Sequence, residues 1–115
     1  MLRWLLLIML ALAGCASRGS EADLQYIKQA RSIGAEWALV NEQAARGRLT
    51  HSYVASMHRS LRDQLRTSSM SLAQPESRYG EEIRALLQQP DEASPEELRT
   101  HVEILKAIED SLESA

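Results

Sequence analysis

The sequence predicts an all-α fold, a small three- to four-helix bundle built on an antiparallel helical hairpin. Apolar residues recur at spacings of three and four along most of the chain, which is the period of a helix with one buried face. No segment alternates Val, Ile, Thr or Tyr with polar residues, as a half-buried strand does. The chain has only 3 Pro and 5 Gly, whereas strong helix formers such as Ala, Leu, Glu, Gln and Arg dominate it.

The first helix of the bundle is expected over residues 21–46. A seam with spacings of four and three would face a partner helix and consists of Tyr26, Ala30, Ile33, Trp37, Val40 and Ala44. Leu24, Ile27 and Leu39 lie off this seam, so we expect the helix to contact neighbours on more than one side. Gly47 is expected to cap its C-terminal end, because glycine adopts the left-handed conformation at little cost.

Thr50 is expected to cap a second helix that continues to about residue 72. Its apolar face would consist of Val54, Met57, Leu61 and Leu65. The opposite face would carry Arg59, Arg62 and Arg66. Since only a few residues separate the first two helices, they should form an antiparallel hairpin.

Pro75 marks a break, and residues 76–89 are expected to form a shorter helix whose inward side chains are Tyr79, Ile83, Leu86 and Leu87. Residues 90–93 are expected to form a loop. The segment 94–97 is the clearest helix start, because Ser94 can cap the free amides, Pro95 fits the first turn and Glu97 can close a capping box. The last helix should run to about Ser114, with an apolar face of Leu98, Leu105, Ile108 and Leu112.

Residues 1–14 have the features of a secretory signal. Arg3 precedes a nearly unbroken apolar run, residues 4–12, which is shorter than the roughly 20 residues of an ordinary membrane-spanning helix. The run ends in Leu12-Ala13-Gly14-Cys15, which resembles the lipobox of bacterial lipoproteins. The alternative is an uncleaved short anchor or a buried core helix, but a core helix would normally present a polar face.

The lipoprotein resemblance covers about the first fifth of the chain, and it implies a membrane anchor. In such proteins the cysteine thiol, here Cys15, receives a diacylglycerol, a peptidase removes the preceding residues, and a fatty acid such as palmitate acylates the new amino terminus. Ala16, rather than Asp, follows the cysteine, which implies the outer membrane, facing the periplasm. We therefore expect residues 15–20 to form a lipidated tether and residues 21–115 to form one helical domain.

The charge of the mature chain is uneven. Residues 46–79 contain six arginines and two acids, a net charge of +4, whereas residues 80–115 contain three basic and ten acidic residues, a net charge of −7. We favour the interpretation that the two segments face each other within one bundle over a polyanion-binding face with an acidic tail. The arginine stripe of Arg59, Arg62 and Arg66 could contact lipid phosphates, lipopolysaccharide or an acidic partner protein, or it could be a solvated face with Arg59 paired to Asp63. Nucleic acid is not an expected partner of an exported chain with a formal net charge of −3.

Three histidines are the candidate metal ligands. His51 and His58 are seven residues apart on the second helix, and His101 lies within the seam of the last helix. The three would converge if these two helices packed together, but the usual ligand spacings of metal sites are absent. We therefore favour a partly buried, hydrogen-bonded His101 and two histidines at the edge of the core, with no metal or other cofactor.

The leading hypothesis for function is a membrane-anchored envelope lipoprotein that acts as a non-enzymatic protein-interaction or accessory module. It would contact the bilayer through acylated Cys15 and bind an envelope protein. The alternative is a periplasmic metal-binding or stress-sensing helical protein. A small enzyme ranks third, because the sequence contains neither G-x-S-x-G nor S-x-x-K.

Overall fold

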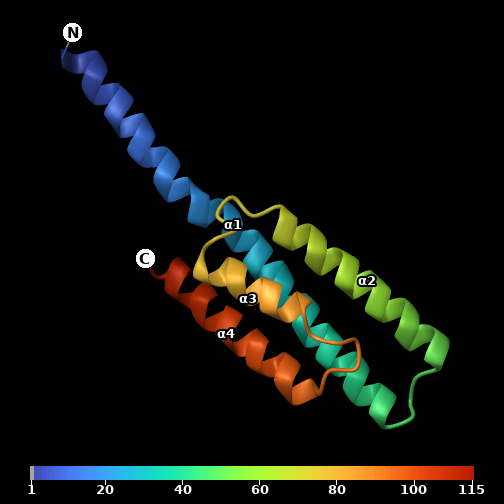
Figure 1. Ribbon diagram of the computed structural model, residues 1–115. Coiled ribbons are helices and arrows are strands. Elements are labelled where there is room, and N and C mark those ends of the chain that lie inside the picture. The colour runs from blue at the N-terminus through green and yellow to red at the C-terminus, as the bar shows by residue number, and fades with distance from the viewer. Residues whose placement is uncertain (1) are drawn as a thin grey trace.

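Four helices follow one another along the chain in the computed structural model, which describes the backbone of residues 2–115 and the side chains of residues 19–115 (Figure 1). They are α1 (Leu2–Ala45), α2 (His51–Met70), α3 (Arg78–Leu87) and α4 (Pro95–Glu113). No strand occurs between residues 2 and 115. The predicted all-α bundle is therefore confirmed. The first helix begins at Leu2 rather than at residue 21, and no proline interrupts this stretch.

The helix α1 is the centre of the bundle and contacts each of the other three helices. The helices α2 and α4 run antiparallel to α1 on its two sides, and α3 runs parallel to it (Figure 1). Over the part of the chain that the structure describes, α2 and α4 do not contact each other. The predicted α1–α2 hairpin is confirmed. None of the described helices is both long and apolar enough to cross a membrane.

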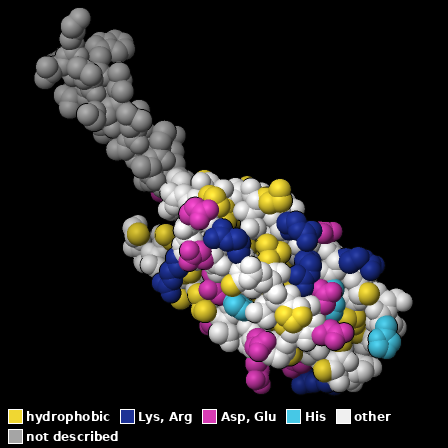
Figure 2. Space-filling model, in the orientation of Figure 1, with side chains coloured by type: hydrophobic (Ala, Val, Ile, Leu, Met, Phe, Trp, Pro, Cys, Tyr) yellow, Lys and Arg dark blue, Asp and Glu magenta, His cyan; other side chains and the backbone are white. Residues whose placement is uncertain are grey.

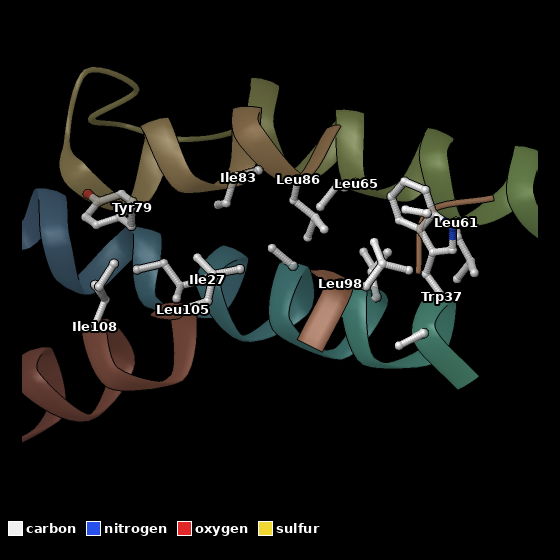
Figure 3. Close-up of a cluster of buried hydrophobic side chains, with 14 of the residues drawn as sticks. Ile27, Trp37, Leu61, Leu65, Tyr79, Ile83, Leu86, Leu98, Leu105 and Ile108 are labelled. Atoms are coloured by element: carbon white, nitrogen blue, oxygen red, sulfur yellow. The ribbon is translucent and has the colours of Figure 1, made fainter. Parts of the chain in front are cut away.

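The apolar core gathers side chains from all four helices (Figure 3). The predicted inward faces of α2, α3 and α4 each supply fully buried residues to this core, namely Leu61, Leu65, Ile83, Leu86, Leu98 and Leu105. Val54 and Met57 on the first turns of α2 are only half-buried, because they lie at the end of the bundle, beside the turn that joins α1 to α2. The predicted faces are therefore correct, and they are most deeply buried toward the middle of the bundle.

The central helix has a second seam beside the predicted one. Its residues are spaced four, three, four, three and four apart, and all six are buried, namely Asp23, Ile27, Ala30, Gly34, Trp37 and Asn41. A Cβ atom on Gly34 would lie 2.9 Å from Cγ2 of Val102 on α4 and 3.1 Å from Cδ2 of Leu86 on α3, so α1 approaches both helices closely there. The prediction that the first helix contacts neighbours on more than one side is confirmed. Leu39, which was expected to contribute to such a contact, is 52% exposed.

The helix ends follow the predicted capping residues closely. Gly47 has a φ of 69°, and the backbone amides of Gly47 and Arg48 donate to the carbonyls of Ala44 and Gln43, which is the Schellman arrangement. The side chains of Thr50 and Ser94 accept hydrogen bonds from the backbone at the starts of α2 and α4, as predicted. The short helix α3 begins at Arg78, two residues later than expected, because Ser77 caps it.

Candidate functional site

The loop between α3 and α4 is held against α1 by two polar side chains. Asn41 donates both amide hydrogens to this loop, at 2.9 Å to the carbonyl of Asp91 and 2.8 Å to that of Ala93. The indole Nε1 of Trp37 donates to the same Asp91 carbonyl at 2.9 Å. Since Trp37 and Asn41 lie one turn apart on the second seam of α1, one helix face fixes the loop backbone.

Arg62 on α2 holds the same loop from the other side. Its guanidinium donates to the carbonyls of Leu87 and Gln89 at 2.7 and 2.8 Å, and to the carboxylate of Asp91 at 2.7 and 3.0 Å. It also lies 5.0 Å from the centre of the Trp37 ring, a cation–π contact. A cation beside these last carbonyls of α3 also complements the helix dipole. Most of the Arg62 donors are therefore engaged within the chain, and its role as a partner contact stays a prediction.

His58 has a tautomer that its neighbour fixes. Its Nε2 lies 2.7 Å from Oδ1 of Asn41. Because both amide hydrogens of Asn41 point to the loop carbonyls, Oδ1 can only accept, and Nε2 of His58 must carry the hydrogen. In the neutral imidazole, the other ring nitrogen, Nδ1, then carries a lone pair. Nδ1 has no hydrogen-bond partner among the described residues. It is also not sealed from solvent.

A pocket of about 650 Å³ opens beside His58, between the C-terminal end of α1, the start of α2 and the α3–α4 loop. Its apolar wall is formed by Ala44, Ala45, Leu49, Val54 and Ala55. The polar lining comes from Asn41, His51, His58, Arg59, Asp91 and Glu92. The sequence analysis treated His51 and His58 as candidate metal ligands and Arg59 as a candidate partner contact, and all three line this pocket together with Glu92.

His101 lies away from this pocket, between α3 and α4. Its Nδ1 is 2.5 Å from Oε1 of Glu82, and its Nε2 is 3.2 Å from the amide nitrogen of Gln89. The amide donates to Nε2, so Nδ1 carries the hydrogen and donates to the carboxylate. The expectation of a partly buried, hydrogen-bonded His101 is confirmed, and the contact ties α3 to α4.

The three histidines are not brought together. They were expected to converge only if the second helix packed against the last one. In the described part of the chain, α2 and α4 do not contact each other. Within residues 19–115 no group of three or more His, Cys, Asp or Glu side chains could hold a metal ion. Cys15, the predicted lipid attachment site, lies outside the residues whose side chains are described.

The arginine stripe divides into three different environments. Arg62 is engaged with the loop, whereas Arg66 forms an exposed ion pair with Asp63 at 3.1 Å. Asp63 therefore pairs with Arg66 rather than with Arg59, contrary to the expected local pair. Arg59 is exposed, lines the pocket and has no ion-pair partner among the described side chains. Dark blue side chains lie over α2 on the face drawn in Figure 2, and every such side chain that α2 contributes is an arginine.

The basic and acidic segments meet where α2 contacts α3, but their charges are largely not paired with each other, contrary to the favoured prediction. Within the described residues, Arg62–Asp91 is the one ion pair that joins residues 46–79 to residues 80–115. The acids of α4 pair with α1 instead, where Glu109 contacts Arg31 at 2.8 Å and Glu113 contacts Lys28 at 2.7 Å. The Lys28 ammonium lowers the pKa of the Glu113 carboxyl through their hydrogen bond and mutual attraction. The prediction failed because α2 and α4 lie on different sides of α1.

A second polar cluster lies at the opposite end of the bundle, around Asp23. This fully buried carboxylate accepts hydrogen bonds from the backbone amides of Ala73 and Gln74 at 2.6 and 2.9 Å, and from the Tyr79 hydroxyl at 2.6 Å. Burial, together with the hydrogen bond to Asp23, raises the pKa of the Tyr79 phenol. The cluster fastens the α2–α3 loop to α1.

Sequence reasoning missed Asp23, Asn41 and Glu82. The signal for the first two was present, because both are polar residues at the ends of a helical seam of otherwise apolar or small residues. Glu82 offered no such signal, since its partner His101 lies 19 residues away on another helix. No protein-family model matches the chain, and no curated protein or solved structure is detectably similar to it.

Proposed function

We propose that the chain is a lipid-anchored envelope protein, held in the outer membrane by acylated Cys15, whose helical bundle acts without catalysis as an interaction or accessory module. The observation that carries this proposal is the leader, in which Arg3 and an apolar run precede Leu12-Ala13-Gly14-Cys15. Two or more acyl chains hold a protein stably at a bilayer, whereas one does not.

Several polar side chains hydrogen-bond to the backbone of the loops, which supports a non-enzymatic role. Asn41 and Arg62 direct their donors to loop carbonyls, and Asp23 accepts from loop amides. General acid–base catalysis needs groups that remain available to a substrate. The polar clusters around Asn41 and Asp23 are instead engaged in holding the two loops at the ends of α3.

The position of the anchor also selects the surface that a partner could reach. Asp23 lies eight residues after Cys15, whereas Asn41 lies 26 residues after it on the same helix. An anchor at Cys15 would therefore keep the Asp23 end near the bilayer and leave the Asn41 end facing the periplasm. Arg59 and Arg66 are exposed on α2, and Tyr53 on the same helix is 49% exposed. Tyr and Arg are enriched among the residues that dominate protein interfaces.

The anchor is tested by expressing the full chain in a Gram-negative host that is fed an alkyne-tagged fatty acid. We expect the parent to be labelled, to lose its first fourteen residues and to fractionate with the outer membrane. Cys15→Ser should abolish the label, and Ser17→Ala is the matched control that should keep it. A parent chain that retains residues 1–14 and stays in the aqueous fraction would contradict the proposal.

The partner surface is tested by placing a photo-crosslinking amino acid at Arg59 or Arg66 in the anchored protein. We expect one reproducible envelope protein to be crosslinked from these positions, and Arg66→Glu to reduce the yield from position 59. The control position is Lys106 on α4, which is exposed on a different side of the bundle. Equal yields from position 106 and from α2 would argue against a partner surface on α2.

A further inference from the structure

The pocket beside His58 has a hydrogen-bond acceptor in its lining. His58 is only 8% exposed, yet it lines the pocket. Its Nε2–H is committed to Asn41, so the atom that remains available is the lone pair of Nδ1. Because Nδ1 has no protein partner among residues 19–115 and is not sealed from solvent, a ligand that brings a donor, such as an ammonium or hydroxyl group, can reach it.

The pocket carries one free positive and one free negative side chain. Arg59 on α2 and Glu92 on the loop are exposed, and neither has an ion-pair partner within residues 19–115. The third charged residue of the lining, Asp91, is already neutralised by Arg62. A ligand with a single charge would therefore meet one favourable and one unfavourable side chain, whereas a ligand with both charges could use both.

Apolar side chains form the rest of the hollow. Leu49 and Val54 are half-buried, and they line it together with Ala44 and Ala55. A volume of about 650 Å³ falls within the range of small-ligand pockets. The lining thus combines an apolar wall, the Nδ1 acceptor of His58 and two opposite charges.

We propose that this pocket binds a zwitterionic ligand, a free amino acid or a short peptide with an apolar side chain. The ammonium group would donate to Nδ1 of His58 and to the carboxylate of Glu92, and the ligand carboxylate would pair with Arg59. The apolar side chain would lie against Leu49 and Val54. This goes beyond the proposed function and does not depend on the lipid anchor, so either can fail while the other holds.

The test is a calorimetric titration of the full chain, purified in detergent, with L-leucine and with leucyl-glycyl-glycine. Two probes lack one charge each, 3-methylbutylamine and 4-methylpentanoate. We expect at least one zwitterion to bind about tenfold or more tightly than either singly charged probe, which corresponds to about 1.4 kcal/mol. Preference for leucine identifies a free amino acid as the ligand, and preference for the tripeptide identifies a peptide.

Variants separate the two charges without disturbing the core. Arg59→Gln and Glu92→Gln should each weaken zwitterion binding by about tenfold, because each removes one charge contact with the ligand. Both side chains are exposed, so neither substitution should disturb the core. The matched controls are Arg66→Gln and Glu96→Gln, which lie on the same helix and just beyond the same loop but outside the pocket. They should leave binding unchanged.

Three results would overturn the proposal. No heat of binding with either zwitterion at millimolar concentration would exclude the site. Binding of the amine as tight as that of leucine would indicate a cation site, in which case Arg59→Gln would strengthen binding. Binding of the acid as tight as that of leucine would indicate an anion site. Thermal melting of each variant verifies that it remains folded.

Discussion

Replacing Asn41 by alanine should lower the free energy of unfolding by about 3 kcal/mol. The amide makes two hydrogen bonds to the loop carbonyls of Asp91 and Ala93 and accepts one from His58, and each such bond contributes about 1 kcal/mol net. The loop carbonyls and the imidazole N–H would all lose their partner at a position that is only 9% exposed. For a domain of this size, the loss corresponds to a fall in Tm of about 12–24 °C.

The assay is urea unfolding followed by far-UV circular dichroism, since every element is helical. Gln43→Ala is the matched control, because this amide lies on the same helix but makes an exposed hydrogen bond with Arg48. It should change the free energy of unfolding by no more than about 0.5 kcal/mol. Asn41→Asp has the same shape and can still accept from His58. Once ionised it cannot donate to the loop, so it should also be destabilised at pH 8.

Two results would refute this reasoning. A loss of less than about 1 kcal/mol for Asn41→Ala would mean that Trp37 and Arg62 are sufficient to hold the loop. An Asn41→Asp variant as stable as the parent at pH 8 would mean that the amide hydrogens are not what the loop carbonyls require. This second result would also remove the basis of the tautomer assigned to His58.

Three further predictions concern the other loop and the helix ends. Gly80→Ala should destabilise the protein by about 1–3 kcal/mol, although alanine ordinarily favours a helix, because its Cβ would clash with the Pro75 carbonyl oxygen; a Tm equal to or above that of the parent would contradict this. Burial and Asp23 raise the pKa of Tyr79, so the phenol stays neutral to a higher pH in the folded state than in the unfolded state. Its contribution to stability should therefore be lost as the pH rises from the ordinary pKa of a phenol through the raised pKa of the folded state. The alkaline absorbance change that is lost in Tyr79→Phe reports this pKa, and a change at or below the ordinary phenol value would disprove the shift. Ser94→Ala should cost about 1 kcal/mol in thermal unfolding, since the Ser94 hydroxyl caps α4; no measurable loss would show that the cap is dispensable.

The features that could be predicted from the sequence are local ones. Gly47, Thr50 and Ser94 act on backbone groups within five residues of themselves, so their caps could be read from neighbouring letters. The buried face of each helix follows from the same short period. Helix bounds after residue 45 agree with the expected ones to within about two residues for the same reason.

The features that could not be predicted depend on how the helices are placed in space. Arg62 contacts Asp91, 29 residues later, and this contact requires that α3 end beside the middle of α2. The expected stripe of three equivalent arginines rested on one helix alone, so it could not show that the loop would engage only the middle one. The pocket is missed for the same reason, because its lining joins three separated segments.

The second seam of α1 does more than bury apolar area, because its ends are polar. Asp23 and Asn41 are 18 residues apart, which is five turns of an α-helix, so they lie on one face about 27 Å apart. A shift of α1 by one turn would still place apolar residues against apolar residues, but it would separate both side chains from the loops that satisfy them. An unsatisfied buried polar group costs about 1–3 kcal/mol, and a carboxylate costs more. The two polar ends therefore favour one register of α1. That register places Oδ1 of Asn41 against Nε2 of His58 and leaves Nδ1 available in the pocket, so the chemistry of the pocket depends on the polar ends of the seam rather than on its apolar middle.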